Sequence, residues 1–132
     1  MKSNIKTLIL HRKENKVMAK NTKSNYQQLS PIHPGEILKD ELEYLGISQA
    51  ELARAINVST RRINEICQTK RGISANTALR LGFYFKMGDK GAEFWVNLQQ
   101  KYERECLKGI LISQGKEMSR QIRPLTKARL AV

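Results

Sequence analysis

The sequence is poor in the residue types that build covalent cross-links and metal sites. It has two cysteines and two histidines among 132 residues. Cys67 and Cys106 fall at apolar positions of expected helices, so they are interpreted as buried, reduced thiols and not as a disulfide framework. His11 and His33 are too few and too far apart to suggest a metal site, even with both cysteines added. Neither a metal nor any other cofactor is therefore expected.

Long apolar runs are also missing. Residues 5–10 form a short, mainly apolar stretch that falls well below the roughly 20 apolar residues of a membrane-spanning helix. Basic residues follow it at once, which does not fit the core of a signal peptide. No membrane partner is therefore expected, and a cytoplasmic location follows by default.

Acidic residues are half as numerous as basic ones. The chain has 24 Lys and Arg against 12 Asp and Glu, which gives a formal net charge of +12. This balance favours a polyanionic partner, because Lys and Arg displace the counterions condensed on phosphates. Residues 1–30 carry a charge of +6, residues 31–108 carry +2 and residues 109–132 carry +4. The sequence therefore predicts one globular domain, 31–108, between two flexible basic arms, 1–30 and 109–132. For the second arm a helix is the alternative, since its basic residues recur about every three or four positions and would form one charged stripe.

The central segment contains repeated signals for the start and the end of helices. His33 suits an N-cap ahead of Pro34, and Gly46 fits the end of this first helix. A second, very short helix begins with a capping box at residues 48–51. It ends near Asn57, a residue type that tolerates left-handed backbone.

Three further helices are expected in the same segment. Ser59 is the N-cap expected for the third helix and Ser74 for the fourth, which the sequence Met87-Gly88-Asp89 breaks. The fifth helix covers roughly residues 90–108. No stretch alternates apolar and polar residues long enough to require a strand. The predicted fold class is therefore all-α, with five helices.

Residues 49–68 have the pattern of a helix-turn-helix. Two short expected helices are joined at a turn on Asn57, and Ala53 is the small residue where they would pass closest. The third helix leaves one polar side facing outward, and an α-helix fits the major groove of DNA. This arrangement predicts binding to double-stranded DNA. Five apolar residues fall where the unit needs buried groups, namely Leu52, Ile56, Val58, Ile63 and Ile66.

Polar side chains that point away from this apolar side are the candidate DNA contacts. Arg can bind guanine through two hydrogen bonds, and Asn or Gln can bind adenine in the same way. Gln49 opens the second helix, where a phosphate is readily held, and Arg62 is a further phosphate candidate. The loop after the third helix would run beside the DNA backbone. The full set is Gln49, Ser59, Thr60, Arg61, Arg62, Asn64, Glu65, Gln68, Lys70 and Arg71.

The same residues also have a simpler interpretation. Residues 49–68 would then be a helical hairpin with a solvated polar face, and residues 70–72 a generic surface turn. The joint occurrence of cap, small residue, turn residue and apolar positions at fixed offsets favours the DNA-binding unit. Individual base contacts stay open at this point, because polar residues on helices are often merely solvated.

Two aromatic residues are candidates for a dimer interface. Trp95 and Tyr102 lie seven residues apart on the fifth expected helix, a spacing that suits a packed seam, and aromatic residues are enriched at interfaces. Packing within the core is the alternative for both. A dimer is also expected because one recognition helix covers few base pairs, whereas two placed about 34–36 Å apart can contact successive major-groove faces.

Acidic residues gather on the first expected helix, and no catalytic arrangement accompanies them. Glu36, Asp40, Glu41 and Glu43 are interpreted as a solvated face, with binding of a basic protein as the alternative. The sequence shows no Ser/His/Asp or Cys/His constellation and no glycine-rich phosphate loop. The chain is therefore not expected to be an enzyme.

Several short motifs between residues 32 and 108 occur together in one known family. With them the chain resembles the HigA (VapI) antitoxins, which are XRE-type, lambda-repressor-like helix-turn-helix proteins. The opening His-Pro-Gly-Glu and the late Phe-Trp-x-Asn-Leu-Gln narrow the likeness to this antitoxin branch. The motifs are Ile32-His33-Pro34-Gly35-Glu36, Ser48-Gln49-Ala50-Glu51-Leu52-Ala53, Ile63-Asn64-Glu65-Ile66, Lys70-Arg71-Gly72-Ile73-Ser74 and Glu93-Phe94-Trp95-Val96-Asn97-Leu98-Gln99.

The resemblance implies a fold, a function and partners. The fold would be a five-helix, lambda-repressor-like domain with flexible basic termini. Proteins of this family are homodimers that repress their own operon and neutralise a small ribonuclease toxin, HigB. The expected partners are therefore operator DNA with an inverted repeat, a HigB-like toxin and a second copy of the chain. A free-standing XRE-type transcriptional regulator is the alternative, and non-specific coating of nucleic acid by the basic arms is a third hypothesis.

Overall fold

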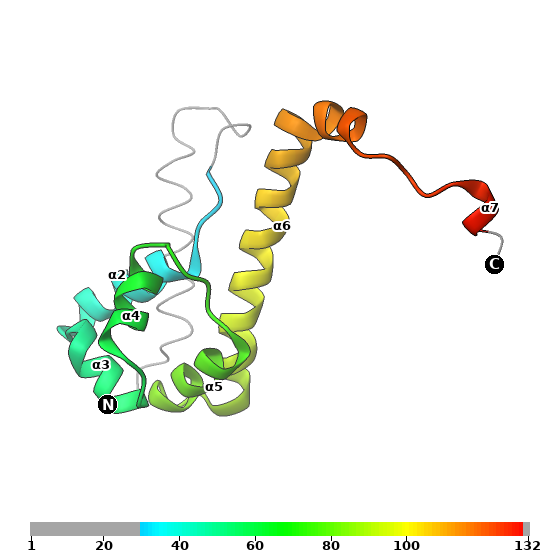
Figure 1. Ribbon diagram of the computed structural model, residues 1–132. Coiled ribbons are helices and arrows are strands. Elements are labelled where there is room, and N and C mark those ends of the chain that lie inside the picture. The colour runs from blue at the N-terminus through cyan, green and yellow to red at the C-terminus, as the bar shows by residue number, and fades with distance from the viewer. Residues whose placement is uncertain (1–29, 131–132) are drawn as a thin grey trace. The chain divides into compact units, whose positions relative to one another are not determined.

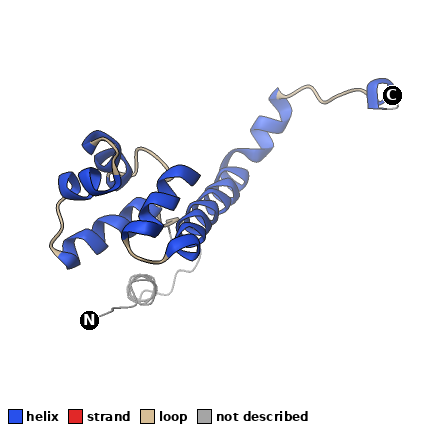
Figure 2. Cartoon of the chain, turned by 90° about the horizontal axis from the view of Figure 1, so that it is seen from below, coloured by secondary structure: helices blue, strands red, loops and turns tan. Residues whose placement is uncertain are grey.

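Most of the described residues lie in helices. The computed structural model describes residues 30–130, and within this range it contains six α-helices and no strand (Figures 1 and 2). The all-α fold class is confirmed. The expected N-terminal arm lies outside the described residues, except for Ser30. The helices are α2 (Pro34–Leu45), α3 (Gln49–Ile56), α4 (Thr60–Cys67), α5 (Ala75–Tyr84), α6 (Gly88–Gln121) and α7 (Lys127–Leu130).

The chain divides into two compact units, residues 1–102 and residues 103–132, and the division falls within α6. Of the described residues, the first unit contains α2 to α5 and the beginning of α6. The second unit contains the remainder of α6 and α7. All the candidate DNA contacts belong to the first unit, whose helices therefore position them.

Serine side chains cap three of the helices, as the sequence predicts. The Oγ atom of Ser48 accepts the backbone N–H of Glu51 at 3.0 Å. Ser59 accepts from Arg62 at 3.1 Å, and Ser74 accepts from Thr77 at 3.2 Å. Each cap satisfies a backbone donor that the helix leaves unpaired, a contribution of about 1 kcal/mol. The three predicted N-caps are confirmed.

A complete, reciprocal capping box is present at the start of α2, one helix before the box that the sequence predicts at residues 48–51. Nδ1 of His33 accepts the N–H of Gly35 at 2.9 Å, and the carboxylate of Glu36 accepts the N–H of His33 at 2.9 Å. The imidazole must be neutral to accept at Nδ1. Burial lowers the pKa of His33, against the opposing effect of the Glu36 carboxylate, and so favours the neutral ring.

Two short turns depend on left-handed backbone. Gly46 ends α2 with a φ angle of 69°, and Asn57 ends α3 with a φ angle of 59°. Glycine adopts this conformation without strain, and asparagine tolerates it. Both predicted helix ends are confirmed, and the turn at Asn57 places α4 directly after α3.

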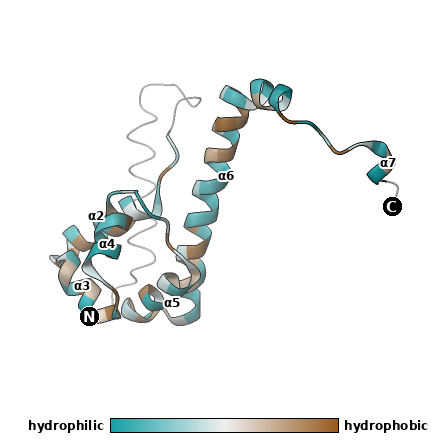
Figure 3. Cartoon of the chain, in the orientation of Figure 1, coloured by the Kyte–Doolittle hydropathy of each residue, from teal (hydrophilic) through white to brown (hydrophobic). Residues whose placement is uncertain are grey.

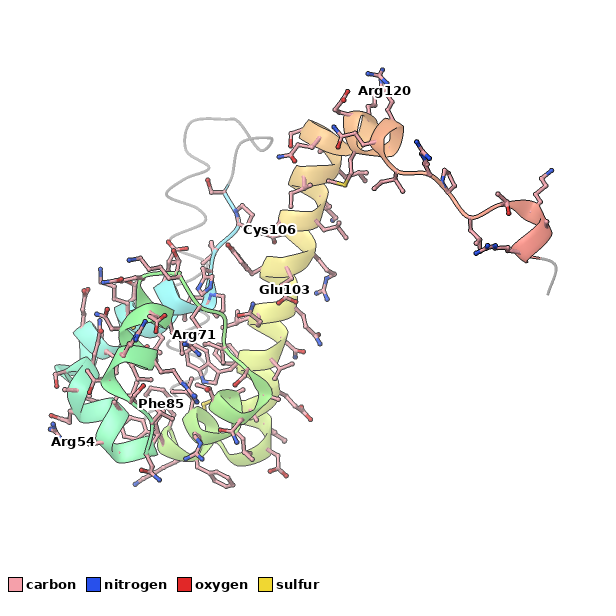
Figure 4. The ribbon with its side chains drawn as sticks, in the orientation of Figure 1. Arg54, Arg71, Phe85, Glu103, Cys106 and Arg120 are labelled. Atoms are coloured by element: carbon pink, nitrogen blue, oxygen red, sulfur yellow. The ribbon has the colours of Figure 1, made fainter. Side chains whose placement is uncertain are left out.

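One apolar cluster fills the first unit. The side chains of Leu52, Ile63 and Ile66 are completely buried in it, so α3 and α4 share one core. Phe85 is also buried and lies inside this unit (Figure 4). Fully burying side chains of this size contributes about 1.5–3 kcal/mol each. This core fixes how α4 is rotated about its own axis.

Trp95 belongs to the same core and not to a dimer interface. Its side chain is 0% exposed within the single chain. The ring stacks on Phe85 at a centroid distance of 6.3 Å and meets Phe94 edge-on at 5.3 Å. A side chain that its own chain encloses has no surface for a second copy. The prediction of a dimer contact at Trp95 is therefore wrong, and the alternative of core packing holds.

Two glycine contacts bring helices close together. A Cβ atom on Gly35 would lie 1.7 Å from the backbone oxygen of Ile66, so the start of α2 rests against α4. A Cβ atom on Gly91 would lie 2.7 Å from the Cα atom of Gly82, so α6 crosses α5 at these glycines. No larger residue fits at either crossing without a backbone shift.

The helix α6 is longer than the sequence predicts. The expected helix at 90–108 was to be followed by a flexible tail, but α6 continues through Gly109 to Gln121. Glycine inside a helix costs only about 1 kcal/mol relative to alanine, and residues with good helix propensity surround this one. The expectation of a flexible tail is therefore wrong for residues 109–121.

No helix between residues 30 and 130 combines the length and the apolar character that a membrane crossing requires.

We expect Gly35→Ala to destabilise the fold by about 1–3 kcal/mol, because the added methyl group overpacks the contact between α2 and α4. Urea unfolding, followed by circular dichroism, measures the change in the free energy of unfolding.

Gly109→Ala is the matched control, because a Cβ atom there meets nothing within 4 Å. It should raise the helix stability by about 0.5–1 kcal/mol. Equal effects of the two substitutions would contradict the close approach at Gly35.

Candidate nucleic-acid interface

The helix pair α3 and α4 forms the predicted helix-turn-helix. The N–H of Val58 donates to the carbonyl of Ala53 at 3.0 Å, which closes the turn between the two helices. Ala53 itself is buried. The predicted apolar positions are confirmed, since Leu52, Ile56, Ile63 and Ile66 are buried and Val58 packs against the core. The pair is anchored in the domain and is not an isolated hairpin.

The outer side of α4 carries the predicted polar residues. Thr60, Arg61 and Asn64 are exposed, and Gln68 at the helix end is exposed as well. Successive residues of an α-helix are about 100° apart, so these four lie on one side, opposite the buried Ile63 and Ile66. By the same geometry Arg62 lies about 100° from Arg61 and about 40° from Ile66, between the polar and the buried sides, and it is half-buried.

An amide pair joins α3 to the middle of α4. Nδ2 of Asn64 donates to Oε1 of Gln49 at 3.1 Å. One N–H of Asn64 is used in this way, while its other N–H and its carbonyl oxygen are left for a ligand. This hydrogen bond orients the Asn64 side chain. It also holds the side chain of Gln49 beside the N-terminus of α3, where backbone N–H groups favour an anion.

Glu65 forms ion pairs with two of the candidate arginines. Its Oε1 atom lies 3.3 Å from Nε of Arg61 and 3.4 Å from Nη2 of Arg71. The side chain of Arg61 is 87% exposed and that of Arg71 is 46% exposed, whereas Glu65 is only 25% exposed. Glu65 therefore acts as an internal partner of the two cations, a role that the sequence did not indicate. Figure 4 shows Arg71 in the loop that follows α4.

The loop after α4 is tied to α6 by one side chain. Oε1 of Gln99 accepts the N–H of Ile73 at 2.9 Å, and the same side chain lies against Gly72. Lys70 and Arg71 precede this anchor and are exposed. Sequence reasoning used Gln99 only as part of the family motif. Its spacing of four residues from the buried Trp95, which puts it on the inner side of α6, was the available signal.

Arg80 is a second residue that sequence reasoning did not single out for the site. Its Nη1 atom donates to the carbonyl of Ile56 at 2.8 Å, and its Nε atom donates to Oδ1 of Asn76 at 2.8 Å. A cation at the C-terminus of a helix is favoured by the partial negative charge there. Arg80 on α5 thus stabilises the end of α3 and the turn that leads into α4.

The remaining sequence candidates are distributed as follows. Tyr102 is half-buried, and its ring meets the ring of His33 edge-on at 4.7 Å, so its role in a dimer stays a prediction. On α2, Glu41 is buried and Glu36 belongs to the cap, which corrects the expectation of one exposed acidic face. Residues 30–130 contain no group of three His, Cys, Asp or Glu side chains that could hold a metal ion.

The fold and this surface define a protein class. A short helix has its inner side fixed in the core, its outer side lined by amides, hydroxyls and arginines, and further cations in the next loop. The molecule is a lambda-repressor-like helix-turn-helix protein.

Comparison with known proteins narrows this class. Virulence-associated protein I of Dichelobacter nodosus is 51% identical over 77 residues, which cover 58% of this chain and 68% of that protein. A HigA-family addiction module antidote protein from Coxiella burnetii has a similar structure, with 39% identity, a TM-score of 0.57 and coverage of 74% of this chain and 100% of the other. The Pseudomonas aeruginosa antitoxin HigA, solved with the higBA promoter, has 47% identity, a TM-score of 0.56 and coverage of 73% and 99%.

No family model matches the chain. The identities and the nearly complete coverage of the related structures nevertheless suffice for an assignment. This chain belongs to the HigA family of antitoxins.

We expect Gln99→Ala to loosen the loop after α4 while the helices stay folded. Loss of one hydrogen bond of about 0.5–1.5 kcal/mol should speed amide hydrogen exchange at Ile73 about threefold to tenfold. Exchange followed by NMR measures this rate. Gln100→Ala is the matched control, since the neighbouring glutamine is exposed. If the Ile73 amide exchanged at the same rate in both variants, Gln99 would not be the anchor.

Proposed function

We propose that this chain is a sequence-specific DNA-binding antitoxin that represses its own operon and neutralises a HigB-like ribonuclease toxin. Its role is one of binding and not of catalysis. The observation that carries the DNA-binding part is the two-sided character of α4. Ile63 and Ile66 are completely buried on one side, and the polar side chains are exposed on the other.

The proposed complex places α4 in the major groove. Arg61 would bind guanine and Asn64 adenine, each through two hydrogen bonds, because these pairings match the base edges geometrically. Thr60 and Gln68 lie on the same side of the helix and complete the base-reading surface. Ser59 also adjoins this surface, but its Oγ atom already caps α4.

Phosphate contacts would surround this base-reading surface. Gln49 and the free N–H groups at the start of α3 are suited to one phosphate. Arg62 on α4 is suited to another. Lys70 and Arg71 project from the loop that Gln99 anchors. Such contacts position the protein on the duplex without selecting a sequence. The similar P. aeruginosa HigA was solved with promoter DNA, which supports this proposal.

The proposed DNA-binding form is a homodimer. Two copies of α4 spaced by one turn of DNA would cover the two halves of an inverted repeat. The second unit offers an apolar face for the partner copy, because Leu107, Ile110, Leu111 and Met118 are exposed and recur at intervals of three, four and seven residues along α6. Figure 3 shows hydrophobic segments in brown along this helix. This spacing places them within a sector of about 100°, as in helices that pack lengthwise.

The antitoxin part of the proposal follows from family membership. The similar C. burnetii protein is described as an addiction module antidote. A toxin partner of this chain would be a small basic ribonuclease encoded beside it. The alternative is a free-standing regulator that has kept DNA binding without a toxin.

We expect the chain to protect a two-fold symmetric stretch upstream of its own operon in a footprint at about 0.15 M salt. Arg61→Ala and Asn64→Ala should each weaken operator binding by about 1–3 kcal/mol, since each removes a two-point base contact. Lys70→Ala is the matched comparison and should weaken binding to all sequences alike, because it removes only a phosphate contact.

An asymmetric footprint would argue against the dimer. Equal protection of operator and scrambled DNA would remove sequence-specific repression at that promoter and favour non-specific coating. Unchanged operator preference in Arg61→Ala and Asn64→Ala would mean that α4 does not read the bases.

We expect co-expression of this chain to restore growth of cells that express the adjacent small open reading frame. The two proteins should also purify as one complex. Two results would favour the free-standing regulator. Cells that express the open reading frame would grow without this chain, or the open reading frame would stay toxic when this chain is co-expressed.

A further inference from the structure

Glu65 is the one acidic residue among the candidate DNA contacts. It lies on α4, one turn after Arg61, and Arg71 returns to it from the following loop. A single oxygen atom, Oε1, lies within ion-pair distance of both guanidinium groups, at 3.3 Å and 3.4 Å. The carboxylate therefore links the recognition helix to the loop that is suited to phosphates.

These ion pairs are weak restraints, because the arginines are largely exposed and water and salt screen the attraction. Glu65 contacts Nε of Arg61, which leaves both Nη groups for the two hydrogen bonds of a guanine edge. Arg61 can therefore bind an operator while it keeps this ion pair. The phosphates of an unrelated sequence offer only a diffuse attraction, which competes with the attraction of Glu65.

The carboxylate also acts on DNA directly. It lies on the surface that would face the duplex, where its negative charge opposes the approach of phosphates. Both effects weaken binding to unrelated DNA, whose phosphates must draw the arginines away from Glu65. The first effect is smaller for an operator that binds Arg61 with its ion pair kept.

We infer that Glu65 is a specificity-determining residue, which restrains Arg61 and Arg71 so that they engage the operator in preference to unrelated DNA. The inference rests on the proposed DNA-binding function and assigns one residue a role within it. Glu65 lowers non-specific affinity and does not itself read a base. A glutamate that read cytosine would instead accept from the base amino group.

The test is Glu65→Gln, which removes the charge and keeps the size of the side chain. Dissociation constants are measured for operator and for scrambled duplexes from about 0.05 M to 0.2 M salt. Affinity for the scrambled duplex should rise about threefold to tenfold at the lowest salt, and operator affinity should change less. The plot of log K against log salt for the scrambled duplex should steepen by about 0.9 for each arginine that gains a phosphate.

Glu93→Gln is the matched control, since Glu93 is an exposed acid on α6 and the change in net charge is the same. An equal gain in both variants would show a general charge effect and overturn the inference. Loss of operator affinity in Glu65→Gln, with an unchanged slope for scrambled DNA, would show base reading and would also overturn it.

A third variant separates restraint from repulsion. Glu65→Gln is made in a chain that already carries Arg61→Gln and Arg71→Gln. In that background it should give only the smaller gain on scrambled DNA that comes from lost repulsion, and the salt dependence should not steepen, because no arginine is released. A gain and a change of slope as large as those in the unsubstituted chain would contradict the restraint. If the unsubstituted chain itself showed no operator preference, the proposed function would fail, and that result is distinct from failure of the inference.

Discussion

The burial of Ile63 and Ile66 is the constraint on which the polar outer side of α4 depends. Both side chains are completely enclosed, so α4 cannot rotate about its axis without exposing them or burying Arg61 and Asn64. Either change would cost several kcal/mol. The contact at Gly35 adds a second restraint, because the start of α2 touches the backbone of α4 at Ile66. The direction in which the polar side chains point is thus set by the apolar side of the same helix.

The helix-turn-helix is held at its turn, and the loop that follows it is held as well, by side chains from outside the unit. Arg80 on α5 binds the carbonyl of Ile56 before the turn, and Gln99 on α6 binds the N–H of Ile73 after α4. On the surface itself, Gln49 accepts a hydrogen bond from Asn64, and Glu65 forms ion pairs with Arg61 and Arg71. Side chains that are held in the orientation in which they bind lose less freedom on binding.

Local features of this protein were predictable because their causes are local. The caps at Ser59 and Ser74 and the left-handed turns at Gly46 and Asn57 each involve residues within one turn of a helix. The environment of Trp95 was harder to predict, since its spacing of seven residues from Tyr102 fits both a core and an interface. The end of α6 differs from the expected end near residue 108, because the cost of about 1 kcal/mol for glycine in a helix is too small for Gly109 to end one among good helix formers.

The all-α class and the outward side of α4 can be predicted from the sequence alone, because the spacing of apolar residues along a helix reports which side is buried. The partners of the polar residues depend on the packing of the helices. Arg80 and Gln99 reach partners 24 and 26 residues away along the chain. Glu65 forms ion pairs within the protein, although its position on α4 made it a candidate DNA contact. Such pairings depend on how the helices pack, which no local pattern specifies.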